Sequence, residues 1–243
     1  MCNKVNLIIL VWQIARDSLG ETNTAIVDNL LHYMDEEDLV FSNDLEIACF
    51  MDDMKSMGFK AFSSWHYYDQ PFCDGIDPED IESTLTKDNN VYWILNQAMY
   101  TLGYSHVRDP FNGKFAKSLM LNYLIHFHGD IHSPLHLISR FTPSKPSGDL
   151  GGNLFKIEYN QYIKNLHSLW DQSMDKITYT TRPLSQSSVQ YLEQMAEQIA
   201  SEFTRDDLAA DLEIKDFDEI AEHGFQLAKQ YAYQGTYYFN INF

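Results

Sequence analysis

Four of the nine histidines of this 243-residue chain fall in the eleven residues from His126 to His136. Within this window His126 and Asp130 are four residues apart, so on a helix their side chains lie one turn apart on the same face. His167 and Asp171 repeat this spacing further along the chain. Imidazole and carboxylate groups are the usual ligands of catalytic zinc, so the pattern predicts a hydrolytic metal centre.

Each of these patterns also has a plainer explanation. A single His-x-x-x-Asp is more often an ion pair on a helix surface or a satisfied core histidine than a pair of metal ligands. The repeated spacing, together with His136 close to the first pair, favours metal binding. His128 and His132 fall in the same window.

Apolar periodicity and capping signals predict a mainly α-helical chain that positions these residues. The longest predicted helix, over residues 114–132, carries both His126 and Asp130. Residues 140–153 are rich in proline and glycine and predict a loop, whereas the alternation over 154–159 predicts a short strand or hairpin arm. We therefore expect one domain over residues 1–243, all-α with a short β-hairpin. The other predicted helices cover 23–34, 44–57, 91–104, 166–174, 185–203 and 217–233, and a further helix start lies at Asp77-Pro78.

The charge of the chain excludes one mode of nucleic-acid binding. With 17 basic and 35 acidic residues the net charge is −18, the opposite of the basic face that holds duplex DNA by its phosphates. Nucleic acid would need a local attraction, which bound divalent cations supply because they reverse the charge of a site. The longest apolar run, over residues 7–12, is too short to span a bilayer, so we expect no membrane attachment.

Five segments in this order resemble the zinc-dependent single-strand nucleases of the S-one/P-one type, which include 3′-nucleotidases. The similarity covers about residues 10–175 and implies the helical phospholipase C/P-one nuclease-like fold. The segments are Ala48-Cys-Phe-Met-Asp52-Asp53-Met-Lys55, Trp65-His66-Tyr67-x-Asp69-x-Pro71-Phe72, His126-x-x-x-Asp130-x-x-x-Pro134-Leu135-His136, Gly151-Gly152-Asn153 and Asn165-Leu166-His167-x-x-Trp170-Asp171.

The resemblance implies three zinc ions, the hydrolysis of phosphodiester bonds in single-stranded DNA and RNA to leave 5′-phosphates, and the hydrolysis of the phosphate ester of 3′-nucleotides. It implies catalytic roles for Asp52, Asp130 and Lys55, the last of which would steady charge on the phosphate. Tyr67 would stack on a base, Asp69 would accept a hydrogen bond from the base edge, and Asn153 would complete the pocket. The first zinc would take Asp52, His66, His126 and Asp130, the second His136, His167 and Asp171, and Asp130 would bridge to the third.

Two departures from the family set further expectations. The family's terminal tryptophan and the histidine that bind the third zinc align with Asn3 and Ile8, neither of which fits that role. The family also continues into a final helix beyond this chain, so we expect truncation at both ends, two zinc ions and weak or absent cleavage. An inactive zinc or nucleotide binder and a zinc phospholipase C-like enzyme stay open as alternatives. The family implies a secreted or lysosomal location, although the chain shows no leader, and we expect a monomer.

Overall fold

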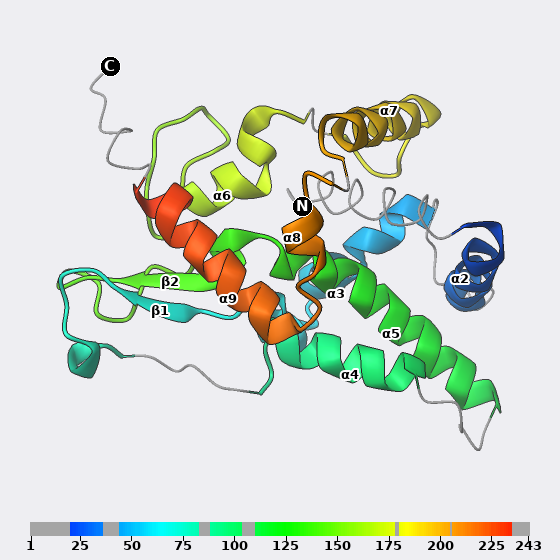
Figure 1. The fold of residues 1–243 in the computed structure, drawn as a ribbon, viewed down its shortest axis with the longest axis horizontal. Helices are drawn as coiled ribbons and strands as arrows, with labels where there is room; N and C mark the ends of the chain where they lie inside the picture. The colour runs from blue at the N-terminus through cyan, green and yellow to red at the C-terminus, as the bar shows by residue number, and fades with distance from the viewer. Residues whose placement is uncertain are drawn as a thin grey trace. The chain divides into compact units, whose positions relative to one another are not determined.

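The computed structural model describes residues 20–35, 44–82, 88–103, 110–177, 180–204 and 206–234. These residues are mainly helical, as predicted, and Figure 1 shows the elements along the chain. The α-helices are α2 (Gly20–Asp35), α3 (Phe50–Ser56), α4 (Val91–Gly103), α5 (Pro110–Ile131), α6 (Leu166–Asp171), α7 (Gln186–Glu202), α8 (Ala209–Leu212) and α9 (Phe217–Leu227). Shorter 3₁₀ segments are η1 (Asp44–Cys49), η2 (Lys60–His66), η3 (Pro78–Asp80), η4 (Pro134–His136) and η5 (Ser173–Asp175), and η6 (Ala228–Tyr233) is a π-helical continuation of α9. None of the described helices is long and apolar enough to cross a membrane.

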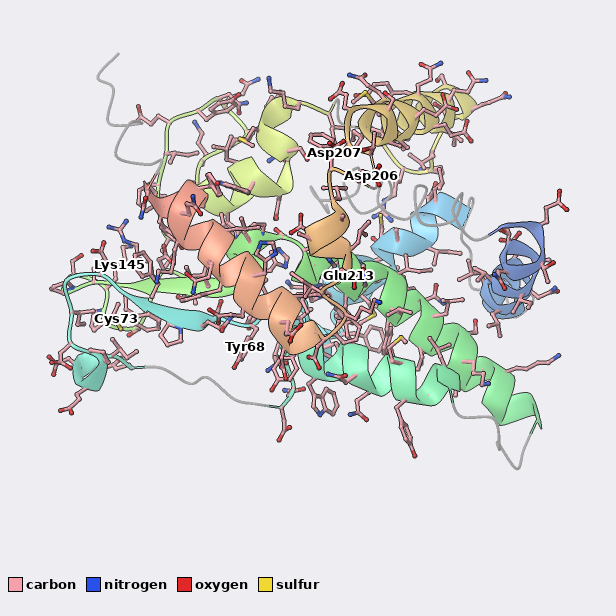
Figure 2. The ribbon with its side chains drawn as sticks, in the orientation of Figure 1. Tyr68, Cys73, Lys145, Asp206, Asp207 and Glu213 are labelled. Atoms are coloured by element: carbon pink, nitrogen blue, oxygen red, sulfur yellow. The ribbon has the colours of Figure 1, made fainter. Side chains whose placement is uncertain are left out.

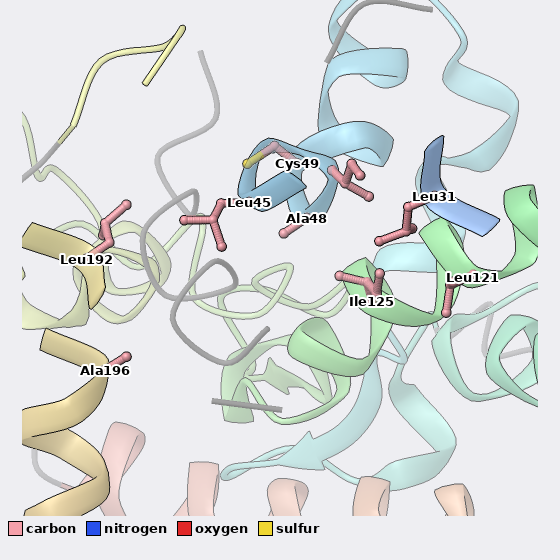
Figure 3. Packing of buried hydrophobic residues seen from close by; sticks show 9 residues of the cluster. Leu31, Leu45, Ala48, Cys49, Leu121, Ile125, Leu192 and Ala196 are labelled. Atoms are coloured by element: carbon pink, nitrogen blue, oxygen red, sulfur yellow. The ribbon is translucent and has the colours of Figure 1, made fainter. Parts of the chain in front are cut away.

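The described residues divide into two compact units, the first drawn from 20–63, 94–129 and 177–213 and the second from 64–93, 130–176 and 214–234. The first unit has its own apolar core (Figure 3). Leu121 and Ile125 of α5, like Leu192 and Ala196 of α7, are four residues apart, so each pair lies on one helix face. Burying a leucine-sized side chain contributes about 1.5–3 kcal/mol, so this cluster holds α5 and its neighbours in place. The cluster comprises Leu31, Leu45, Ile47, Ala48, Cys49, Leu121, Ile125, Leu192 and Ala196.

The second unit is built on a two-stranded parallel sheet. Strand β1 (Gln70–Cys73) pairs with β2 (Ile138–Phe141), with Gln70 opposite Ile138 and Cys73 opposite Phe141. Cys73 ends β1, and Lys145, in the turn after β2, lies at the same end of the sheet (Figure 2). One buried apolar cluster of this unit comprises Leu135, Ile138, Leu166, Ala228, Ala232 and Tyr233.

The predicted β-hairpin is wrong in its position and its topology. Residues 154–159 form no strand and make one isolated antiparallel bridge, between Lys156 and Asn165. The sheet instead pairs two four-residue strands, one of which contains Pro71, across a long stretch of sequence. Such short strands carry too little alternation to be seen locally, because their pairing is decided by tertiary contacts.

Two of the helix predictions also need correction. The segment predicted as one helix over 44–57 begins as the 3₁₀ segment η1 and becomes α-helical only at Phe50. The helix start at Asp77-Pro78 is real, since the Asp77 side chain accepts a hydrogen bond from the Glu79 N–H at 3.0 Å, but it opens only the three-residue η3. The remaining predicted helices are confirmed within a few residues, except that the segments over 166–174 and 217–233 each divide in two, at α6–η5 and α9–η6.

Candidate metal centre

The second unit gathers three of the predicted ligands, His136, His167 and Asp171. Asn165 caps α6 by accepting a hydrogen bond from the Ser168 N–H at 2.7 Å, which starts the helix so that His167 and Asp171 are one turn apart. His136 Nε2 lies 3.5 Å from Asp171 Oδ1, and His167 Nε2 lies 3.4 Å from Asp171 Oδ2. The two imidazole rings are stacked, with centroids 5.0 Å apart and planes 15° apart.

Three histidine rings are held in the same way. His126 Nδ1 lies 2.6 Å from the Ala48 carbonyl oxygen, and His136 Nδ1 lies 2.7 Å from the His66 carbonyl oxygen. His167 Nδ1 lies 2.8 Å from the carbonyl oxygen of Gly151. A carbonyl can only accept, so each Nδ1 carries the proton and the lone pair of the neutral ring is on Nε2. This is the tautomer and orientation that a zinc-ligating histidine needs, so the donor set fits the metal.

Asp52 and His126 belong to the first unit, where their ligand atoms lie within 4.8 Å of each other. Asp52 is in the first turn of α3, and His126 is fully buried on α5. A neutral imidazole beside a carboxylate is a donor pair that suits zinc, so this pair also has the character of a metal site.

His66 and Asp130 are paired in the second unit. Asp130 is 1% exposed, and its Oδ2 lies 2.8 Å from His66 Nδ1 while its Oδ1 lies 3.5 Å from His136 Nδ1. One buried carboxylate thus faces two histidines. Asp130 is also on α5, one turn after His126, as the sequence predicted.

The residues expected to contact substrate lie close to these ligands in the sequence. Tyr67 directly follows His66 and is 39% exposed, and Asp69 lies two residues further. Burial raises the pKa of Asp69 from 3.8 to about 6; the neighbouring His136 imidazole opposes this rise, and the Asp149 carboxylate adds to it. A carboxyl group with a pKa of about 6 is still protonated in mildly acidic solution, where it can donate a hydrogen bond as well as accept one.

Lys55 and Asn153 occupy more open positions. Lys55 is exposed in the last turn of α3, three residues after Asp52 and therefore on the same side of the helix. The Asn153 side chain donates to the Leu150 carbonyl oxygen at 2.9 Å, which fixes it against its own turn. His128 and His132 are exposed, in contrast to His126 and Asp130. The positions assigned to Asn3 and Ile8 lie outside the described residues.

Sequence reasoning did not identify two carboxylates that support the site. Arg182 makes a two-pronged ion pair with Asp53, with Nη1 2.6 Å from Oδ2, and so anchors the residue next to Asp52. Asp149 is buried in the second unit and accepts several hydrogen bonds. The stretch Gly148-Asp149-Leu150-Gly151-Gly152 could have drawn attention to it, since aspartate between glycines is typical of a side chain that closes a turn.

Comparison with known proteins identifies the family. The family model of the S1/P1 nucleases matches residues 9–239. Endonuclease 3 of Arabidopsis thaliana is 28% identical over 164 residues, which are 66% of this chain and 50% of that protein. Endonuclease 4 is 29% identical over 167 residues, 66% of this chain and 51% of that protein, and Endonuclease 1 is 26% identical over 238 residues, 94% and 73%. The chain thus spans about half the length of two of these relatives. The match over almost the whole sequence shows that the chain belongs to the S1/P1 nuclease family.

Proposed function

We propose that this protein is a zinc-dependent endonuclease and 3′-nucleotidase that hydrolyses phosphodiester bonds of single-stranded DNA and RNA and leaves 5′-phosphates. The proposal rests on the orientation of three histidines in a chain that belongs to this family. In His126, His136 and His167 a backbone carbonyl oxygen accepts from Nδ1, so Nε2 points away from that carbonyl and can bind a metal ion. The Asp171 carboxylate beside two of these rings supplies the negative charge that a dication requires.

We assign the seven predicted donors to two zinc ions. The second ion would be held by His136, His167 and Asp171, whose ligand atoms lie within 4.8 Å of one another. The first would use the Asp52 and His126 pair with His66 and Asp130, an assignment supported by the one-turn spacing of His126 and Asp130 on α5. Bound zinc supplies Lewis acidity, which lowers the pKa of a coordinated water and neutralises negative charge on a phosphate.

The remaining residues bind and orient the substrate. Lys55 offers a mobile positive charge to the phosphate on the side of α3 that carries Asp52. The half-exposed Tyr67 ring offers a face on which an unpaired base can stack, worth about 1–3 kcal/mol per base. Asp69 can accept from or donate to a base edge, depending on pH. Asn153 would close the pocket from the glycine-rich turn.

Single-stranded nucleic acid fits this chain better than duplex. A net charge of −18 repels an extended phosphate backbone, so attraction must be concentrated at the metal ions. Stacking needs a base that is not already paired, and every base has a face to offer, so we propose little sequence preference. We further propose a monomer that acts away from membranes, in a secreted or lysosomal location.

The decisive experiment uses protein stripped with a chelator and then titrated with zinc. We expect zinc to restore slow cleavage of a single-stranded oligonucleotide in preference to the matched duplex, to leave 5′-phosphates, and to restore slow 3′-nucleotide hydrolysis. Asp171→Asn should lower the rate of oligonucleotide cleavage more than the loss of a group that only hydrogen-bonds to a metal ligand, which costs about 10–100-fold. The control is Asp218→Asn, an exposed carboxylate on α9.

Two results would overturn the proposal. Stoichiometric zinc without cleavage of any nucleic acid would make this chain a zinc or nucleotide binder. Hydrolysis of phosphatidylcholine in place of oligonucleotide would make it a phospholipase C-like enzyme.

A further inference from the structure

A tight turn in the second unit holds one of the proposed ligands. Over Gly148, Leu150, Gly151 and Gly152 the backbone φ angles are +82°, +57°, +62° and +81°. Left-handed backbone at so many neighbouring positions is unfavourable, particularly at leucine, unless the surroundings impose it. The turn carries the Gly151 carbonyl group, which accepts the hydrogen bond from His167 Nδ1.

The Asp149 carboxylate ties this turn together from inside. Asp149 is 2% exposed, and its Oδ1 accepts from the Arg140 N–H at 3.0 Å and from the Gly152 N–H at 3.1 Å. The Ser139 Oγ accepts from the N–H groups of Asp149 and Leu150, each at 3.1 Å. Hydrogen bonds to a buried carboxylate are stronger than those between neutral groups, so the position of the turn depends on Asp149.

The Tyr233 hydroxyl completes the set of donors to Asp149. It lies 3.0 Å from both carboxylate oxygens, and Tyr233 is itself buried at 2% exposure. Its ring packs against Phe72 at a centroid distance of 5.8 Å, and the Arg140 guanidinium carbon lies 5.7 Å from the ring centre. Burial and the Asp149 charge raise the pKa of Tyr233, so the hydroxyl remains a donor.

Tyr233 reaches Asp149 from the end of a π-helical segment. η6 continues α9 with a wider turn, so its later side chains point in directions that an α-helical continuation would not give them. Such wide turns are often found at functional sites. The hydroxyl of Tyr233 is the only part of that side chain that a phenylalanine would lack, which makes its role separable from core packing.

We propose that Tyr233 and Asp149 are positioning residues of the zinc site formed by His136, His167 and Asp171. The Tyr233 hydroxyl donates to the Asp149 carboxylate, which also accepts from the Gly152 N–H and so fixes the 149–152 turn. In this turn the Gly151 carbonyl oxygen accepts from His167 Nδ1 and orients that ring. Removing the hydroxyl leaves the ligands in place but loosens the carbonyl that orients one of them. This inference rests on the zinc site of the proposed function.

The test compares Tyr233→Phe with Tyr231→Phe, a matched control because Tyr231 is 57% exposed in the same η6 segment. Each 243-residue protein is stripped of metal and titrated with Co²⁺, with binding followed by visible absorption and calorimetry. His167→Ala shows which binding class belongs to this site. We expect Tyr233→Phe to lower the Co²⁺ affinity of that binding class by about 3–10-fold and to change its absorption bands. This loss is smaller than the one caused by removing a residue that contacts a metal ligand directly. Tyr231→Phe should match the wild type.

The outcomes separate this inference from the proposed function. Co²⁺ binding with the same affinity and bands in Tyr233→Phe as in the wild type would overturn the positioning role alone. Absence of the His167-dependent class in the wild type would overturn the zinc site itself, and the inference with it. Should Tyr233→Phe fail to fold, Ser139→Ala removes the other side chain that holds the turn, and unchanged Co²⁺ binding in that variant would also contradict the inference.

Discussion

Gly151→Ala should destabilise the metal-free protein strongly, because residue 151 meets two separate penalties. Its φ of +62° costs an alanine about 1–2 kcal/mol. A Cβ atom there would also lie 2.2 Å from the Leu135 carbonyl oxygen, whereas ordinary contact begins near 3.4 Å. The backbone must therefore move by about 1 Å, and overpacking of this kind costs about 1–3 kcal/mol more. The expected loss of unfolding free energy is about 2–5 kcal/mol.

Gly75→Ala is the control for the first penalty. Gly75 is in the same unit with a φ of +72°, but the nearest atom to its Cβ position, in Pro143, is 4.0 Å away. Its replacement should therefore cost only about 1–2 kcal/mol. Urea unfolding of both variants with a chelator present measures the difference without any contribution from bound metal. Equal losses for the two variants would refute the close approach of Gly151 to Leu135.

Three further predictions follow from other contacts. Arg182→Ala should lower the unfolding free energy by about 1.5–3 kcal/mol, because it removes both hydrogen bonds to the Asp53 carboxylate; urea unfolding measures this, and no loss would contradict the pairing. The pKa of Asp69 is about 6 in the folded protein and near 3.8 when unfolded, so its contribution to metal-free stability should fall as pH rises through this interval. Asp69→Asn should make the stability fall less, or rise more, over this interval, as unfolding measured at several pH values will show; an unchanged pH dependence would contradict the raised pKa. Tyr67→Ala should raise KM for a single-stranded oligonucleotide by about 5–150-fold through lost stacking, and steady-state kinetics with an unchanged KM would argue against a base on this ring.

The helical part of the fold could be read from the sequence because each helix carries its own signals. Helix α7 has Ser185 as a cap, whose side chain accepts from the Ser188 N–H, and an apolar stripe that includes Leu192 and Ala196. The parallel sheet could not be read in this way. Gln70 and Ile138 pair across a long stretch of sequence, and four residues are too few for a period-two pattern to show.

The candidate site likewise contains residues that could be predicted from the sequence and groups that could not. His167 and Asp171 could be paired from the sequence because one helical turn fixes their spacing. The groups behind them could not, since the Gly151 carbonyl is a backbone atom and leaves no trace in residue identity. Tyr233 is distant in sequence from Asp149, and nothing local to either residue predicts their hydrogen bond.

The hydrogen bond between His136 Nδ1 and the His66 carbonyl oxygen links the two proposed zinc positions through main chain. His66 is assigned to one ion and His136 to the other, so a shift of residue 66 on metal uptake would be passed directly to the His136 ring. Binding free energies coupled in this way are reciprocal, so each ion should strengthen or weaken the hold on its neighbour by the same factor. The two zinc ions would then bind cooperatively, and a different cation that distorts one position would change the affinity of the other.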